Sequence, residues 1–218
     1  ISSVDLYGQS KTNQDFKSPT EMVDKANKLV VTKPLDAFKL ATDAAVISKK
    51  NKDKRVEANA YNTLGTLYYN AGEFTKAITY FTRAKNIYAT ITDEKSEEYS
   101  LKYLGKSYEA VNDRANSISN YGSAEQKSNS SYDKADYRIK NSKLKRGQGK
   151  SEEAISDLER ELKTNTLLDP NQKIDIYLEL GDLYIAKNDT VKGVDLINKA
   201  LIDSKNSRND SVSVSALN

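Results

Sequence analysis

The chain has 218 residues, of which 37% are hydrophobic and 30% charged, and its formal net charge is +3. A net charge this small gives no global field that would require nucleic acid as a partner. The absence of cysteine and histidine excludes thiol nucleophiles, serine–histidine triads and the usual ligands of zinc sites. The sequence contains no run of about 18 apolar residues of the kind that spans a membrane.

Residues 1–17 are expected to form a leader or a disordered segment. The stretch ISSVDLYGQSK has the small residue Gly8 just before Gln9, which resembles the end of a cleaved export signal. An unstructured leader explains the same residues, and both interpretations stay open.

A pair of helices is predicted over residues 18–53. Its second helix carries alanines at helical spacing, and these alanines fit the pattern of the units that follow: Ala37, Ala41 and Ala44.

Three later stretches repeat one pattern, and they begin at Ala58, Glu98 and Ile174. Each stretch has a large residue, a Leu-Gly pair, a tyrosine, a turn, a small residue, a large residue and an alanine. These places are held by Tyr61, Leu64-Gly65, Tyr68, Gly72-Glu73, Ala77, Phe81 and Ala84, by Leu101, Leu104-Gly105, Tyr108, Asn112-Asp113, Ser117, Tyr121 and Ala124, and by Tyr177, Leu180-Gly181, Tyr184, Asn188-Asp189, Gly193, Ile197 and Ala200.

The residue types explain this pattern physically. Small residues at the eighth and twentieth places let two helices, here called helix A and helix B of a unit, approach closely where they cross, and large residues fill the space around the crossing. The Gly-Glu and Asn-Asp pairs are suited to ending helix A and capping helix B. An unrelated helical bundle would not keep the small residues in register.

A weaker unit is predicted over residues 135–168. Gly149 and Ala154 match the pattern, but four polar residues hold places that should be apolar: Arg138, Asn141, Ser142 and Lys145. Its helix B is clear, with Ser151 as the expected N-cap. Pro170 is expected to open the helix that follows.

The pattern resembles the tetratricopeptide repeat. This resemblance implies an all-α fold, a right-handed superhelix of about four to five helix–turn–helix repeats, with residues 18–218 as a single solenoid. The repeats lie near residues 18–53, 58–91, 98–131, 135–168 and 174–207, and residues 211–218 match the start of a further repeat. Because a half-covered last layer is unfavourable, we expect the chain to be a fragment of a longer protein.

The same resemblance places a ligand groove along the helices A. The predicted groove residues are Asn62, Thr66, Tyr69, Tyr99, Lys102, Tyr103, Lys106, Lys140, Lys143 and Arg146. The groove is expected to be polar and aromatic at one end, basic in the middle and acidic at the far end, where the last repeat supplies Asp175, Leu178, Glu179, Asp182 and Ile185.

The stretch from Lys134 to Lys150 has seven basic residues and one acidic residue. One interpretation is a site for an anion or a terminal carboxylate. The other is a solvated helix that tolerates charge, and the sequence alone does not exclude either interpretation.

No catalytic site, cofactor or metal site is predicted. The carboxylates show no convergent pair for acid–base chemistry, and no phosphate-binding glycine motif occurs. One basic helix beside an acidic helix is a poor surface for nucleic acid. We therefore expect a protein or peptide partner, and an acidic partner would fit the basic middle of the groove.

The long units and the Tyr-, Asn- and Lys-rich composition resemble the exported tetratricopeptide sensor regions of bacterial envelope signalling proteins of the histidine-kinase type. The resemblance implies a non-enzymatic sensor or interaction module in the periplasm or cell envelope, linked to the membrane only through segments outside this chain, and compatible with a homodimer. The alternative is an intracellular adaptor or peptide receptor, in the cytoplasm and without a membrane link.

Overall fold

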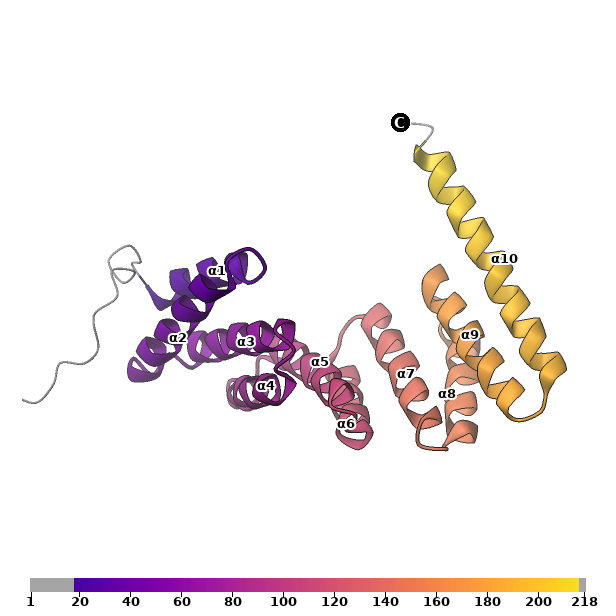
Figure 1. Ribbon diagram of the computed structural model, residues 1–218, viewed down its shortest axis with the longest axis horizontal. Helices are drawn as coiled ribbons and strands as arrows, with labels where there is room; N and C mark the ends of the chain where they lie inside the picture. The colour runs from indigo at the N-terminus through magenta and orange to yellow at the C-terminus, as the bar shows by residue number, and fades with distance from the viewer. Residues whose placement is uncertain (1–17, 216–218) are drawn as a thin grey trace, which may run out of the picture. The chain divides into compact units, whose positions relative to one another are not determined.

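The computed structural model describes residues 18–215, and for residues 208–215 it describes only the helical backbone. The expected leader, residues 1–17, lies outside this part. Residues 18–215 form ten α-helices and no strands (Figure 1): α1 Pro19–Leu29, α2 Pro34–Lys50, α3 Lys54–Asn70, α4 Phe74–Thr90, α5 Glu94–Ala110, α6 Arg114–Lys127, α7 Ser131–Arg146, α8 Ser151–Thr164, α9 Pro170–Ala186 and α10 Thr190–Ser215.

The ten helices form five consecutive pairs, so the predicted all-α helical-repeat fold class is confirmed. The end of the chain differs from the expectation of a new repeat. Residues 211–215 continue α10 and do not begin a further helix. No glycine or proline follows Gly193 in this stretch to interrupt the helix; residues 216–218 lie outside the described part of the chain.

The turns within the helix pairs follow the predicted chemistry. Gly72, Asn112 and Asn188 have positive φ angles of 77°, 61° and 66°, as expected where an αL residue ends a helix. Asp113 caps α6 by accepting a hydrogen bond from the backbone N–H of Asn116, and Asp189 accepts one from the N–H of Lys192.

Two predicted helix starts have different outcomes. Pro170 does open α9, behind a capping box formed by Asp169 and Gln172. The prediction for α8 is wrong, because Lys150 is the N-cap and Ser151 is already the first helical residue. The turn explains the shift: Gly149 holds the αL conformation there, with a φ angle of 77°, and the cap therefore falls on the next residue.

The small residues lie at the predicted helix crossings. A Cβ atom on Gly65 would lie 2.8 Å from the ring of Phe81, and one on Gly105 would lie 2.8 Å from the ring of Tyr121. On Gly181 it would lie 2.6 Å from the side chain of Ile197. These separations are far below van der Waals contact, so only glycine fits beside these side chains.

Contacts divide the chain into two compact units, one up to Asp93 and one from Glu94 onward. The first unit contains α1 to α4, with a core that includes Met22, Ala41, Val56 and Leu64. The second contains α5 to α10, and its larger core cluster joins α7, α8, α9 and α10 through residues that include Ile139, Leu158, Ile176, Leu180 and Leu196. A second cluster joins α5, α6 and α7 around Leu101, Tyr121 and Tyr137.

In the weaker repeat, ion pairs add to the apolar core at two of the places where the other repeats have apolar side chains. Arg138 on α7 pairs with Glu125 on α6 at 2.7 Å and with Glu161 on α8 at 2.5 Å. Lys145 pairs with Asp157 on α8 at 2.5 Å. The polar residues at apolar places are therefore part of the packing between neighbouring helices.

The crossing predicts opposite effects for two glycine substitutions. Because the Phe81 ring is fully buried and has no room to move, we expect Gly65→Ala to lower the free energy of unfolding by about 1–3 kcal/mol. A Cβ atom on Gly122 in α6 would meet only the Asn141 amide, at 3.9 Å, so Gly122→Ala should raise it by about 0.5–1 kcal/mol through helix propensity. Urea unfolding followed by circular dichroism measures both, and equal effects would contradict the crossing.

Candidate partner-binding surface

The predicted groove residues of the first unit lie on α3 and are half-buried. Asn62 donates a hydrogen bond from Nδ2 to the Tyr88 hydroxyl at 3.4 Å, and Thr66 donates one to the carbonyl of Asn62 at 3.0 Å. The ring of Tyr69 meets that of Phe74 edge to face, with centroids 5.4 Å apart. These side chains are thus positioned by contacts within their own helix pair.

On α5 the structure brings three predicted residues together in one stripe. The rings of Tyr99 and Tyr103, one helical turn apart, have centroids 4.7 Å from each other. The ammonium group of Lys106 lies over the Tyr103 ring at 5.0 Å. This stripe combines aromatic faces with a cation held in place by a ring, which is a surface that suits peptide side chains and carboxylates.

Lys102 points instead toward α7. Its ammonium group lies 3.8 Å from the Asp133 carboxylate and 5.9 Å from the centroid of the Tyr137 ring. The Tyr137 hydroxyl in turn donates to Glu98 on α5 at 2.9 Å. Burial raises the pKa of Tyr137, and the hydrogen bond to Glu98 raises it further. This set of contacts joins two successive helices A.

The basic stretch on α7 is largely neutralised by neighbouring acids. Lys140 pairs with Asp136 at 3.8 Å, and Arg146 pairs with Glu179 at 2.9 Å and with Asp182 at 3.2 Å on α9. Arg138 and Lys145 are also in ion pairs, so four of the seven basic residues of this stretch are paired with acids. Within residues 18–207, Lys143 makes no ion pair, and it is exposed, so it is the predicted α7 cation most available to a ligand.

Glu179 is the most unusual charged group on this surface. It is 3% exposed, and its Oε1 atom has an ion pair with Arg146 but no hydrogen-bond partner. Burial raises the pKa of Glu179 above its usual value, although the nearby charges of Arg146 and Lys143 act in the opposite direction. The sequence predicted Glu179 as part of the acidic end of the groove, but it did not predict that the side chain is buried.

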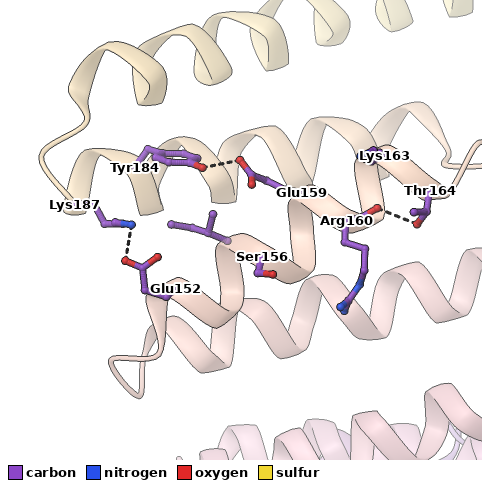
Figure 2. Close-up of a pocket in the computed structure, with 9 residues that line it drawn as sticks. Glu152, Ser156, Glu159, Arg160, Lys163, Thr164, Tyr184 and Lys187 are labelled. Carbon is purple, nitrogen blue, oxygen red and sulfur yellow. Dashed lines mark hydrogen bonds and ion pairs between the residues drawn. The ribbon is translucent and has the colours of Figure 1, made fainter.

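The sequence did not predict an open cavity of about 630 Å³ between α8 and α9. Its lining residues are Glu152, Ile155, Ser156, Glu159, Arg160, Lys163, Thr164, Tyr184 and Lys187. Figure 2 shows Tyr184 and Glu159 facing each other, with the Tyr184 hydroxyl 2.6 Å from the carboxylate to which it donates. Glu152 and Lys187 pair at 2.5 Å at one end.

The cavity is polar, but its acids are already engaged. Lys192 donates hydrogen bonds to the oxygen of Tyr184 at 2.7 Å and to Glu159 at 2.9 Å. These bonds raise the pKa of Lys192 to about 12 and lower that of Glu159, for which the Tyr184 hydroxyl is the main cause. The cavity therefore does not present a pair of free carboxylates for acid–base catalysis.

Comparison with known proteins agrees with this architecture. Residues 58–90 match the tetratricopeptide repeat family. No curated protein matches the sequence.

In the part of the chain that the structure describes, no helix is long and apolar enough to cross a membrane, and no cluster of potential metal-ligating residues occurs.

Several solved structures are similar in fold. The nearly identical TPR-like repeats of a putative kinesin light chain from Podosopora anserina superimpose with a TM-score of 0.71 at 14% identity, covering 88% of this chain and 99% of that one. MamA gives 0.66 at 19% identity, covering 88% and 94%. YrrB, described as a TPR protein with an unusual peptide-binding site, gives 0.62 at 16% identity, covering 84% of each chain. The fold is thus of the tetratricopeptide type, and no catalytic family is indicated.

The buried carboxyl of Glu179 predicts a pH-dependent stability effect. Since folding raises its pKa, this carboxyl stabilises the fold below its usual pKa, and that contribution is lost as the pH rises through the raised value. Glu179→Gln mimics the protonated form. We expect its melting temperature to be equal to or above that of the wild type at pH 7.5, with a smaller difference at pH 4.

Thermal unfolding followed by circular dichroism at both pH values measures this effect. Asp182→Asn is the control, because Asp182 also pairs with Arg146 but is exposed, and an exposed pair contributes little. A Glu179→Gln variant that loses stability at pH 7.5 but not at pH 4 would show that the attraction of Arg146 outweighs burial.

Proposed function

We propose that this chain is a non-catalytic module that binds a protein or peptide through its helices A. The observation that carries the proposal is the stripe on α5, where Tyr99, Tyr103 and Lys106 form one aromatic and cationic surface. The resemblance in fold to YrrB, whose description names a peptide-binding site, supports the same class of function. An acidic segment fits best, because Lys106 and Lys143 are the predicted groove cations left without an ion pair among the described residues.

The proposed context is the ligand-sensing or interaction region of a bacterial envelope signal-transduction protein. In this context binding would favour one arrangement of the helices, and parts of the protein outside this chain would respond to it. The second candidate is an intracellular adaptor, which would use the same surface without a membrane link. Cell fractionation of the tagged full-length protein distinguishes the two, since the first requires it in the envelope fraction and the second in the cytoplasm.

A charge reversal tests the binding surface directly. We expect the double variant Lys106→Glu with Lys143→Glu to weaken binding of a fluorescent acidic peptide by at least about tenfold, because two attractive contacts become repulsive. Fluorescence anisotropy titration at two salt concentrations gives the affinity and its electrostatic share.

The control with the same change in charge reverses two residues of the stretch from Lys134 to Lys150 that lie outside the predicted groove. Lys134→Glu with Lys150→Glu changes the net charge equally, and these lysines also make no ion pair in the described part of the chain. An equal loss in both double variants would reduce the effect to long-range charge and would refute the proposed surface.

A further inference from the structure

An ion pair with one buried and one accessible partner joins α7 and α9 within the predicted groove. Arg146 lies in the last turn of α7, and its Nε atom is 2.9 Å from Oε1 of Glu179 near the middle of α9. The side chain of Glu179 is 3% exposed, whereas that of Arg146 is 40% exposed. A ligand in the groove can therefore reach the cation but not the carboxylate that retains it.

Two cations and one acid act on the Glu179 carboxyl. Arg146 and Lys143 of α7 attract its charge, and Asp182 on the same helix repels it. Burial outweighs the attraction, so the pKa of Glu179 lies above its usual value. The carboxyl therefore takes up a proton at a higher pH than an exposed glutamate does.

Charged side chains of the other helices packed against α9 contact it elsewhere. Glu152 and Glu159 of α8 contact Lys187 and Tyr184, and Lys192 of α10 contacts Tyr184 as well. Among the described residues no hydrogen bond reaches the buried Oε1 atom of the carboxyl. The cations of α7 are thus the groups that oppose its protonation.

Arg146 is placed to act as a further cation of the binding surface. It follows Lys143 by three residues, so both lie on one face of α7. While Glu179 is ionised, a ligand that drew Arg146 away would leave a buried charge unpaired. A proton on the carboxyl removes this restriction. The remaining partner, Asp182, is exposed, and an exposed pair holds a side chain weakly.

We propose that Glu179 controls whether Arg146 takes part in ligand binding. The ionised carboxylate retains Arg146, and the protonated carboxyl releases it to bind an acidic ligand beside Lys143. The module then binds acidic partners more tightly in a mildly acidic medium. This inference rests on the proposed function, because it concerns the regulation of the same surface.

A peptide whose own charge does not change with pH tests the inference. The probe is a fluorescent peptide with cysteic acid in place of its acidic residues, because the sulfonate stays ionised at both pH 5 and pH 8. Fluorescence anisotropy gives its affinity for the full 218-residue chain. This affinity should rise about threefold to fivefold from pH 8 to pH 5, as expected for one added, partly exposed ion pair. Glu179→Gln should have the higher affinity at both pH values.

Two controls separate the release of Arg146 from a general change in charge. Asp182→Asn removes an exposed carboxylate that pairs with the same guanidinium group, and it should change the affinity less than about twofold. Glu179→Gln combined with Arg146→Gln restores the net charge of the wild type and should lose the gain. An equal gain in Asp182→Asn, a gain retained in the double variant, or a wild-type affinity that is the same at both pH values overturns the inference.

Failure of the proposed function gives a different result. If no variant binds the probe at either pH, or if reversing the charges of Lys106 and Lys143 leaves binding unchanged, the surface itself is wrong. If the wild type binds through these lysines but Glu179→Gln binds no more tightly at pH 8, the proton-controlled release alone is wrong. Circular dichroism must show every variant folded at both pH values.

Discussion

The close crossing of helix A and helix B determines the arrangement of each repeat. Where Gly65 meets Phe81 and Gly105 meets Tyr121, no Cβ atom fits beside the ring. The rings fill this space completely, since both are fully buried. A crossing fixed at one small residue fixes the rotation of both helices. It thereby decides which side chains of helix A face the next repeat and which remain on the surface.

The weaker repeat, residues 135–168, has fewer apolar residues around its crossing. The place of the crossing glycine is taken by Ser142, which is buried and whose hydroxyl has no hydrogen-bond partner. In this repeat Arg138 adds contacts to both neighbouring helices, because it pairs with Glu125 on α6 and with Glu161 on α8. Such pairs lose hydration energy when buried, so they hold helices in a specific arrangement more than they add stability. The same residues make the stretch from Lys134 to Lys150 less basic toward a ligand than its composition indicates.

Local patterns predicted the fold because each crossing depends on residues of one repeat. The glycines, the turn residues Asn112 and Asn188, and Pro170 all have roles that their near neighbours determine. The prediction of Ser151 as a cap follows from the residue type alone, whereas the repeat register gives the capping place to Lys150, as the structure has it. Contacts between repeats were not predictable in this way. The pairing of Tyr184 with Glu159 or of Arg146 with Glu179 depends on the exact offset between units of unequal length.

The contacts between repeats also limit where an acidic ligand can bind. Arg146 is the partner of the buried Glu179, and a ligand that took Arg146 away would leave a buried carboxylate unpaired, at a cost of about 3–5 kcal/mol. Lys143 and Lys106 form no ion pair in the described part of the chain, although the charge of Lys143 also acts on Glu179. A carboxylate bound by these lysines therefore gains their attraction without disrupting the packing of α7 against α9. For this reason the affinity of the module should be set by the cations that do not join helices.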